Sequence, residues 1–359
     1  MKTITVPFGE RAYRVTIGCG ALESGDWAHF VDRRERCAVI VSQRVLELHG
    51  AYIERVLAGL ESADLLPMPD GEERKSYAHA ERYFNELLSR GYGRGATVIA
   101  IGGGVVGDFA GFVAAAYMRG VRFIQVPTTL LAMVDASIGG KVAVNISAGK
   151  NIVGAFHQPA AVVADIAFIE TLPDEELKNG IAESLKHALI GEPSLCTMLR
   201  ENDLASIRRP DTLEELVFRS AGFKAGVVSQ DEREGGLRAI LNFGHTAGHA
   251  IESCLEYRGI MHGAAVAAGM QIAIDLSRAR GLLDERVARE YRELAARYDL
   301  IPRGLALNAA QVVAHMRYDK KNAGGEIRFV LLAGVGEPRI NQPVPEGELR
   351  AAVDDFLAG

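Results

Sequence analysis

The stretch TVIAIGGGVVGD, residues 97–108, decides the fold, and a helical run over residues 109–117 follows it. Residues 97–101 form a short, continuous apolar run, typical of a strand buried on both faces of a parallel sheet. From Gly102 onward the glycines match the pattern G-x-G-x-x-G. Glycine lets the backbone approach a pyrophosphate, whose charge then meets the amide groups at a helix N-terminus. The stretch predicts a strand, a nucleotide-binding turn and a helix; a plain tight turn is the alternative.

The rest of the first half alternates strand and helix patterns around that stretch. We expect strands at residues 3–6, 13–17, 38–42, 123–126 and 162–164, and a helix at residues 77–90. The first two of these strands are expected to pair as a hairpin. Strands separated by helical segments predict an α/β domain with an open, mostly parallel, Rossmann-like sheet.

After about Pro173 the pattern becomes helical. Helices are expected at residues 174–191, 212–228, 245–255, 263–280 and 285–298, with one late strand at residues 327–332. This shift predicts an α/β domain over residues 1–174 and a mainly α-helical domain over residues 175–359. The glycine turn makes the first the expected nucleotide-binding domain, and the candidate metal residues described below lie in the second. Because ligands favour clefts between domains, we expect the active site in the interdomain cleft.

Composition excludes several classes of protein. The 359 residues are 48% hydrophobic, which suits two folded domains and excludes a disordered chain. Forty Lys and Arg against 46 Asp and Glu give a net charge of −6, which argues against broad binding of nucleic acid or membrane surfaces but permits a local basic pocket. The four cysteines form no CxxC pair, and no apolar stretch reaches the roughly 20 residues of a membrane span. We expect a cytoplasmic protein with reduced thiols.

Histidines and a glutamate suggest a metal site. His245 and His249 stand four residues apart in NFGHTAGH, His262 lies further on, and Glu183 lies upstream with His187 four residues later. Spacing alone favours His245 and His249 as ligands of a catalytic divalent ion, most plausibly zinc. Glu183 and His187 are a rival pair, and either pair could simply lie on a helix surface. The absence of H-E-x-x-H disfavours a metalloprotease.

Cations and amides gather in glycine-rich segments of this acidic chain. Such a set predicts a pocket for a phosphorylated substrate, although any single lysine is more often merely solvated. The set comprises Arg119, Lys141, Asn145, Lys150, Asn151, Lys224, Arg238, Asn242, Lys320 and Lys321.

Longer motifs, in order along the chain, resemble the 3-dehydroquinate synthase family of the sugar phosphate cyclase superfamily. They are GGGVVGDFAGFVAAAYMRG, FIQVPTTLLAMVDASIGGKVAVN, GKNIVGAFHQP, AESLKHALI, RAILNFGHTAGHAIE and MHGAAVAAGM, and the resemblance covers residues 69–332. It implies a lyase of the shikimate pathway, which leads to chorismate and the aromatic amino acids. Such an enzyme converts DAHP to 3-dehydroquinate and phosphate with NAD and one divalent ion, zinc or cobalt.

The resemblance also implies roles for individual residues. Glu183, His245 and His262 match metal ligands, whereas His249 matches a catalytic histidine that binds no metal, which replaces the expectation from spacing. Arg119 matches an arginine that reaches the phosphate in the neighbouring subunit, so a homodimer is implied. Substrate-pocket residues are matched by Lys141, Lys186, Lys224, Arg238, Asn151, Asn242 and either Lys320 or Lys321.

For the nucleotide, the resemblance implies contacts from four segments and a few single residues. They are Asp70, Gly71, Glu72, Lys75, Gly103, Gly104, Val105, Val106, Gly107, Asp108, Thr128, Thr129, Asp135, Lys141, Lys150, Phe168, Ile169, Glu170 and Thr171.

Some positions depart from the family pattern. Val142-Ala143 stands where Thr-Gly is common, residues 146–148 (ISA) where His-Pro-Leu is common, and Ala247 where Phe is common. These departures leave open a related cyclase, such as 2-epi-5-epi-valiolone synthase or 2-deoxy-scyllo-inosose synthase. A metal- and NAD-dependent polyol dehydrogenase and a non-enzymatic NAD-binding protein are further alternatives. The retained Gly139-Gly140-Lys141 and Leu241-Asn242 favour the dehydroquinate branch.

Overall fold

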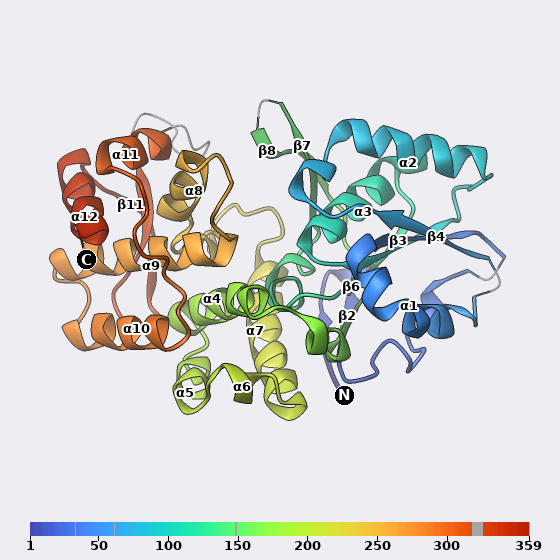
Figure 1. Ribbon diagram of the computed structural model, residues 1–359, viewed down its shortest axis with the longest axis horizontal. Coiled ribbons are helices and arrows are strands. Elements are labelled where there is room, and N and C mark those ends of the chain that lie inside the picture. Colours follow the sequence, from blue (N-terminus) through green and yellow to red (C-terminus); the bar gives the residue numbers. More distant parts are fainter. Residues whose placement is uncertain (33, 61, 148, 318–325, 359) are drawn as a thin grey trace. The chain divides into compact units, whose positions relative to one another are not determined.

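The computed structural model describes residues 1–32, 34–60, 62–147, 149–317 and 326–358 (Figure 1). The chain separates into two compact units. The first comprises Met1–Pro173 and Arg208–Ser229, and the second comprises Asp174–Ile207 and Gln230–Gly359. The sequence pattern predicted domains over residues 1–174 and 175–359. The boundary near residue 174 agrees with the two compact units, but residues 208–229 belong to the first unit rather than the second.

A seven-stranded sheet forms the centre of the first unit, in the order β1-β2-β9-β6-β5-β3-β4. All neighbours are parallel except β1 and β2, which pair as the predicted hairpin. The mostly parallel Rossmann-like sheet is thus confirmed. The strands are β1 Lys2–Val6, β2 Tyr13–Gly18, β3 Cys37–Ser42, β4 Ala63–Met68, β5 Thr97–Gly102, β6 Arg122–Pro127 and β9 Ala161–Asp165.

Helices cover both faces of this sheet, which is why its strands are continuous apolar runs. In β3, Val39 packs on the face of the sheet that holds Ile53 of α1 (Gln43–Leu57). Ile40 packs on the opposite face with Phe109 of α3 (Gly104–Ala116), and α2 (Tyr77–Ser89) covers that same face. The turn quoted first, from β5 into α3, therefore begins a helix packed directly on the sheet.

The hairpin of β7 (Lys141–Ile146) and β8 (Gly149–Phe156) is a feature that the sequence patterns did not predict. The sequence analysis selected residues of this segment for their basic and amide side chains near glycines, and it predicted no strand there. Val142 is 2% exposed and belongs to the core that α3 shares with the sheet. The departure from the family pattern at this position therefore serves packing. Helix α1 and the edge strand β4, which contains Pro67, were also not predicted.

Helix α7 (Pro210–Gln230) is the segment that returns to the first unit. Leu213, Leu216 and Val217 on this helix are buried. Just before it, the Arg208 guanidinium donates hydrogen bonds to the carbonyl oxygens of Ile169 and Leu172, at 2.9 and 2.7 Å. Helical periodicity does not say which sheet or bundle a helix packs on, so the composition-based division missed this return.

The second unit is mainly helical, as predicted, with one small hairpin. Strand β10 was expected, and β11 beside it was not. The elements are α4 Asp174–Ile190, α5 Ser194–Glu201, α6 Leu204–Ile207, α8 His245–Cys254, α9 His262–Ala279, α10 Glu285–Arg297, α11 Ala309–Arg317, β10 Arg328–Leu332, β11 Pro338–Pro343 and α12 Glu346–Ala358. All four cysteines are free thiols. Within the described part of the chain, no helix is both long enough and apolar enough to cross a bilayer.

Asp165, at the end of β9, is fully buried and held by hydrogen bonds alone. Its Oδ1 accepts from the backbone N–H groups of Gly20 and Ala167, each at 3.0 Å. Its Oδ2 accepts from the N–H of Leu22 at 2.9 Å and from the Tyr52 hydroxyl at 2.5 Å. Four donors fill the acceptor capacity of the carboxylate, so this side chain joins the loop after β2, helix α1 and the segment after β9.

We expect Asp165→Asn to lower the free energy of unfolding of the first unit by about 2–4 kcal/mol, because an NH₂ group would face donors in place of one oxygen. Tyr52→Phe removes only one of the four donors and should cost about 1.5 kcal/mol. The single tryptophan, Trp27, donates to the carbonyl of Leu22 at 2.8 Å, so its fluorescence during urea unfolding reports on this region. An unchanged midpoint in Asp165→Asn would contradict the assigned role.

Candidate functional site

The glycine loop places the start of α3 at the end of β5. A Cβ on Gly102 would lie 2.6 Å from the Cβ of Val106, and one on Gly107 would lie 2.9 Å from Oε1 of Gln125 in β6. Only glycine fits either position without a shift. The first N–H groups of α3 have no partner within the helix, so this close turn forms an anion-binding N-terminus. The chemistry suits the pyrophosphate of a dinucleotide.

Lys75 links the PDGEERK segment to that helix. This side chain is 3% exposed, forms an ion pair with Asp108 of α3 and donates to Oδ1 of Asn151 in β8 at 2.6 Å. Burial raises the pKa of the Asp108 carboxyl, and the ammonium of Lys75 opposes that shift. Nearby, Oε1 of Glu72 accepts from Nδ2 of Asn145 at 2.7 Å. These contacts bring together the PDGEERK segment, the first part of α3 and the β7–β8 hairpin, each of which contains residues expected to contact the nucleotide.

The other residues predicted for the nucleotide lie in the same unit. Asp70 accepts from the Ser42 hydroxyl at 2.6 Å, at the N-terminus of α1. The N–H of Thr128 donates to the carbonyl of Gly102 at 3.0 Å. Nζ of Lys224 lies 2.8 Å from Oδ1 of Asp135. These contacts place each segment along or beside the carboxyl ends of the parallel strands, where open α/β sheets bind ligands.

Phe168–Thr171 is held by helix α1. The rings of His49 and Phe168 meet edge to face, with centroids 5.0 Å apart. Nε2 of His49 lies 2.7 Å from the hydroxyl oxygen of Thr171. Two predicted substrate or subunit contacts of this unit, Lys141 at the start of β7 and Arg119 after α3, are exposed.

Glu183, His245 and His262 come together in the second unit from three different helices. Glu183 lies in the middle of α4, while His245 and His262 are the first residues of α8 and α9. Their potential ligand atoms lie within 4.8 Å of one another. Nε2 of His245 and Nε2 of His262 are each 3.7 Å from Oε1 of Glu183. One carboxylate and two imidazoles are a donor set typical of catalytic zinc.

Close packing of α8 against α9 explains why the two histidines meet. A Cβ on Gly269 would overlap the carbonyl oxygen of Gly244, and one on Gly248 would lie 2.9 Å from the carbonyl oxygen of Ala265. Gly244 precedes α8 with a φ of +79°, a conformation that favours glycine. Glycines therefore let the two backbones approach and place the N-terminal residues of both helices beside α4.

The other ring nitrogen of each histidine has a partner of its own. Nδ1 of His245 lies 3.1 Å from the carbonyl oxygen of Phe243, and Nδ1 of His262 lies 3.4 Å from both carboxylate oxygens of Glu252. Burial lowers the pKa of His245 well below its usual value, helped by the charge of Lys186. Burial also acts to lower the pKa of His262, but the hydrogen bond and charge of Glu252, together with the charge of Glu183, outweigh it and the pKa is raised. Both Nε2 atoms face Glu183.

The residues fit a divalent metal ion. Glu183 is fully buried, and neither of its oxygens has a hydrogen-bond partner among the described residues. Lys186, one turn along α4, forms an ion pair with it. The ammonium of Lys186 compensates part of the charge of this buried carboxylate, and a carboxylate that also faces two imidazole nitrogens is suited to a cation.

His249 lies beside this set. Its ring centroid is 5.2 Å from that of His245 and 6.0 Å from that of His262. A second possible donor set, His249, Glu252 and His262, shares one histidine with the first. Among the described residues, neither of these two sets contains both His245 and His249. The pair favoured by spacing is therefore not brought into one donor set.

The remaining predicted residues of the second unit are largely buried. Lys186 is 1% and Arg238 3% exposed, and Nη1 of Arg238 donates to the carbonyl of Glu232 at 2.5 Å. Nδ2 of Asn242 donates to Oε1 of Glu234 at 2.5 Å. Lys320 and Lys321 lie outside the described residues.

The sequence analysis did not select Glu234 or Glu252. Glu234 has no periodic relation to the histidines, so no local signal distinguishes it. Glu252 stands seven residues after His245 and three after His249, on the same face of α8, and helical spacing would have found it.

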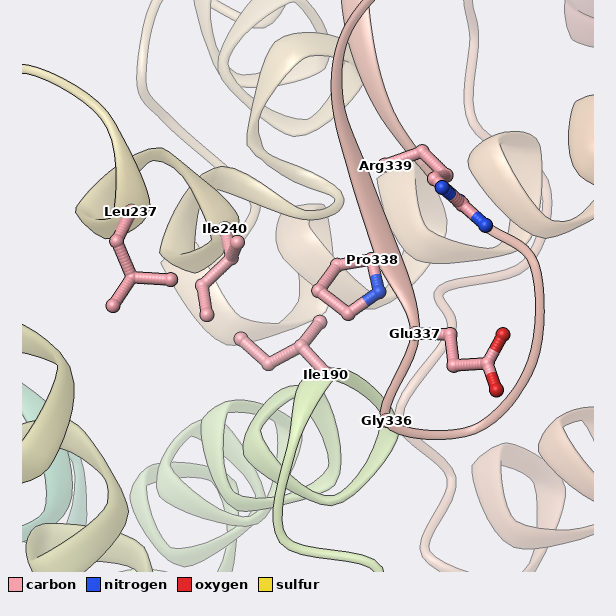
Figure 2. A pocket seen from close by; sticks show the side chains of 7 residues that line it. All are labelled: Ile190, Leu237, Ile240, Gly336, Glu337, Pro338 and Arg339. Atoms are coloured by element: carbon pink, nitrogen blue, oxygen red, sulfur yellow. The ribbon is translucent and has the colours of Figure 1, made fainter.

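A surface pocket of about 480 Å³ lies elsewhere in the second unit. It is lined by Ile190, Leu237, Ile240, Gly336, Glu337, Pro338 and Arg339 (Figure 2). None of these residues was predicted for the site. The lining is mostly apolar and contains one carboxylate, that of Glu337. The pocket therefore lacks the combination of a glutamate and two histidines found at Glu183, His245 and His262.

Comparisons with known proteins agree with the geometry. Residues 65–179 match the family model for the N-terminal part of 3-dehydroquinate synthase, and residues 180–322 match that for the C-terminal part. A 3-dehydroquinate synthase of Methylococcus capsulatus is 45% identical over 361 aligned positions, covering 99% of each chain.

Two solved cyclase structures share the fold. One is 2-deoxy-scyllo-inosose synthase with carbaglucose-6-phosphate, NAD⁺ and Co²⁺, at 27% identity and a TM-score of 0.89, covering 99% of this chain and 100% of that one. The other is 2-epi-5-epi-valiolone synthase from Streptomyces hygroscopicus with NAD⁺ and Zn²⁺, at 25% identity and a TM-score of 0.87, covering 96% and 97%.

We expect His245→Ala to lose the bound metal and activity together, because His245 supplies one of the two imidazoles facing Glu183. His249→Ala should keep one metal ion per chain and lose turnover. Elemental analysis of the purified variants distinguishes the two donor sets. Full metal content in His245→Ala, or loss of metal in His249→Ala, would favour the set that contains Glu252.

Proposed function

Because the chain belongs to the 3-dehydroquinate synthase family, we propose that Glu183, His245 and His262 are its metal ligands. The enzyme is an NAD- and divalent-metal-dependent lyase of the shikimate pathway that converts DAHP, a seven-carbon phosphorylated keto sugar acid, to 3-dehydroquinate and phosphate. The observation that supports the ligand assignment most directly is the buried Glu183 carboxylate, which lacks hydrogen bonds among the described residues and faces two imidazole nitrogens.

The reaction combines a transient oxidation, elimination of phosphate, re-reduction and an intramolecular aldol closure of the ring. When bound, NAD supplies a reversible hydride acceptor and the divalent ion supplies Lewis-acid polarisation of the substrate hydroxyl. The protein residues bind and orient the substrate and the nucleotide, and they move protons. Accurate placement is a large contribution in such a reaction, about 7–11 kcal/mol in favourable intramolecular cases.

In the first unit, we propose that the N-terminus of α3 binds the pyrophosphate of NAD through Gly103–Asp108. Lys75, held by Asp108 and Asn151, keeps the PDGEERK segment beside this helix. Phe168–Thr171, supported by His49 and Arg208, contacts the remainder of the nucleotide. Further contacts come from Asp70, Gly71, Glu72, Thr128, Thr129, Asp135, Lys141 and Lys150.

For the substrate, the proposed contacts are cations and amides that bind phosphate and carboxylate groups. Lys186, Lys224 and Arg238 are each less than 10% exposed, which is unusual for these residue types and favours a role in binding an anion. The full set is Lys141, Asn151, Lys186, Lys224, Arg238, Asn242 and either Lys320 or Lys321.

His249 is proposed to carry the proton of the substrate hydroxyl that is oxidised. Its ring lies next to both histidine ligands, within reach of a group bound there directly or through one water. The leaving phosphate can serve as the base for the elimination, which would leave His249 as the protein group that exchanges protons with the hydroxyl oxygen.

DAHP should be the preferred substrate, because the relative at 45% identity is a 3-dehydroquinate synthase, whereas the structures of the two other cyclases are 27% and 25% identical. We expect the purified enzyme with NAD and Co²⁺ or Zn²⁺ to release one phosphate per carbocycle from DAHP, without accumulation of NADH. Sedoheptulose 7-phosphate and glucose 6-phosphate are the matched comparison substrates.

Phosphate release measured beside absorbance at the NADH maximum tests this expectation. Faster turnover of either comparison substrate would move the chain to another branch of the superfamily. Accumulation of NADH would instead indicate a polyol dehydrogenase.

We further propose that the enzyme acts in the cytoplasm as a homodimer and that Arg119 binds the substrate phosphate of the neighbouring subunit. Arg119 is exposed and lies two residues after the buried Tyr117, which follows α3. This is the placement needed for a contact with another chain.

Subunit complementation tests the role of Arg119. Arg119→Ala and His249→Ala should each be inactive alone. Coexpressed, they should recover about a quarter of wild-type activity, because half of the dimers are mixed and each mixed dimer has one complete site. No recovery in mixed dimers that are verified by two affinity tags would contradict a contribution from the neighbouring subunit.

A further inference from the structure

Glu252 is a carboxylate beside the proposed metal site that the proposed function does not use. It lies near the end of α8, its side chain is 13% exposed, and its two oxygens are each 3.4 Å from Nδ1 of His262. The opposite nitrogen of the same ring, Nε2, lies 3.7 Å from Oε1 of Glu183. The imidazole of His262 therefore stands between two carboxylates, one on each side.

The two proposed histidine ligands differ in what holds them. His245 has a neutral partner, the carbonyl oxygen of Phe243, which is fixed by the backbone. His262 begins α9 and depends on a side chain from another helix. A carboxylate that accepts the Nδ1 proton fixes the tautomer and the ring orientation, and it makes Nε2 a stronger electron donor.

We propose that Glu252 is a positioning residue that orients His262 and strengthens its bond to the metal ion, without itself binding the ion. This inference rests on the proposed ligand set Glu183, His245 and His262. The distance of 3.4 Å is long for a charged hydrogen bond, and metal binding at Nε2 should strengthen the bond because it makes the Nδ1 proton more acidic.

The alternative is that Glu252 is itself a ligand, in the donor set with His249 and His262. The two possibilities predict different losses. Removal of a partner that only orients a histidine ligand lowers metal affinity about 10–100-fold and leaves the ligands in place. Removal of a ligand takes away one of the three protein groups that hold the ion.

The experiment measures the dissociation constant of Zn²⁺ for the full chain by competition with a fluorescent chelator. Glu252→Ala should weaken binding about 10–100-fold, and Glu252→Gln, which keeps an acceptor oxygen without the charge, should weaken it less. Excess Zn²⁺ should restore most of the turnover of both variants. The visible spectrum of the Co²⁺ form should remain that of a site with the same ligands.

Glu256→Gln is the matched control, because Glu256 follows the same helix, is exposed and was not assigned to the site. It should bind Zn²⁺ as the wild type does. His262→Ala gives the reference for a lost ligand. Circular dichroism of the metal-free variants shows whether each remains folded.

Wild-type affinity in both Glu252 variants would overturn the inference while leaving the ligand set intact. Loss in Glu252→Gln as severe as in His262→Ala, with a changed Co²⁺ spectrum, would overturn it by making Glu252 a ligand. Full metal binding by His262→Ala would instead refute the ligand set on which the inference rests.

Discussion

A buried carboxylate that faces two imidazole nitrogens is the constraint around which the second unit is organised. Glu183 is fully buried, and within the described chain its surroundings are a lysine one helical turn away and two imidazole nitrogens. Burial of an ion is costly unless other charges compensate for it. The divalent ion proposed for this site would meet that need, and Gly244, Gly248 and Gly269 let α8 and α9 approach closely enough to bring the proposed ligands together. The proposed metal site therefore depends on the packing glycines as well as on the residues proposed as ligands, although only the latter would take part in the chemistry.

The first unit is proposed to bind a dinucleotide, which is an anion, although the chain has a net negative charge. The groups proposed to bind it are the N-terminus of α3 and a few buried cations, rather than a generally basic surface. Lys75 illustrates the arrangement, because its contacts with Asp108 and Asn151 tie a loop, a helix and a hairpin together. Asp165 does the same with hydrogen bonds alone. In both cases a buried charge organises segments that are far apart in the sequence.

The departures from the family pattern are informative because of where they lie. Val142 packs in the core beside Gly111, and Ala143 pairs with Gly154 across the β7–β8 hairpin. Small apolar side chains suit these positions, and the adjacent Lys141 is exposed at the start of the strand. The changes therefore alter the packing of the hairpin and leave its charged residues in place. This agrees with membership of the dehydroquinate branch.

The sequence by itself determined the alternation of strands and helices in the first half, the helical second half and the glycine turn, because burial on both faces and helical amphipathicity leave periodic patterns. It did not predict α1, the Pro-containing edge strand β4, or β7, β8 and β11, where turns and polar residues interrupt the pattern. Spacing along one helix can only pair residues such as His245 and His249. Tertiary structure decided which groups meet. Glu183, His245 and His262 come together from three different helices, Glu252 on α8 contacts His262 at the start of α9, and α7 packs with the first unit. Contacts between distant segments depend on how faces pack, and a local pattern does not record that.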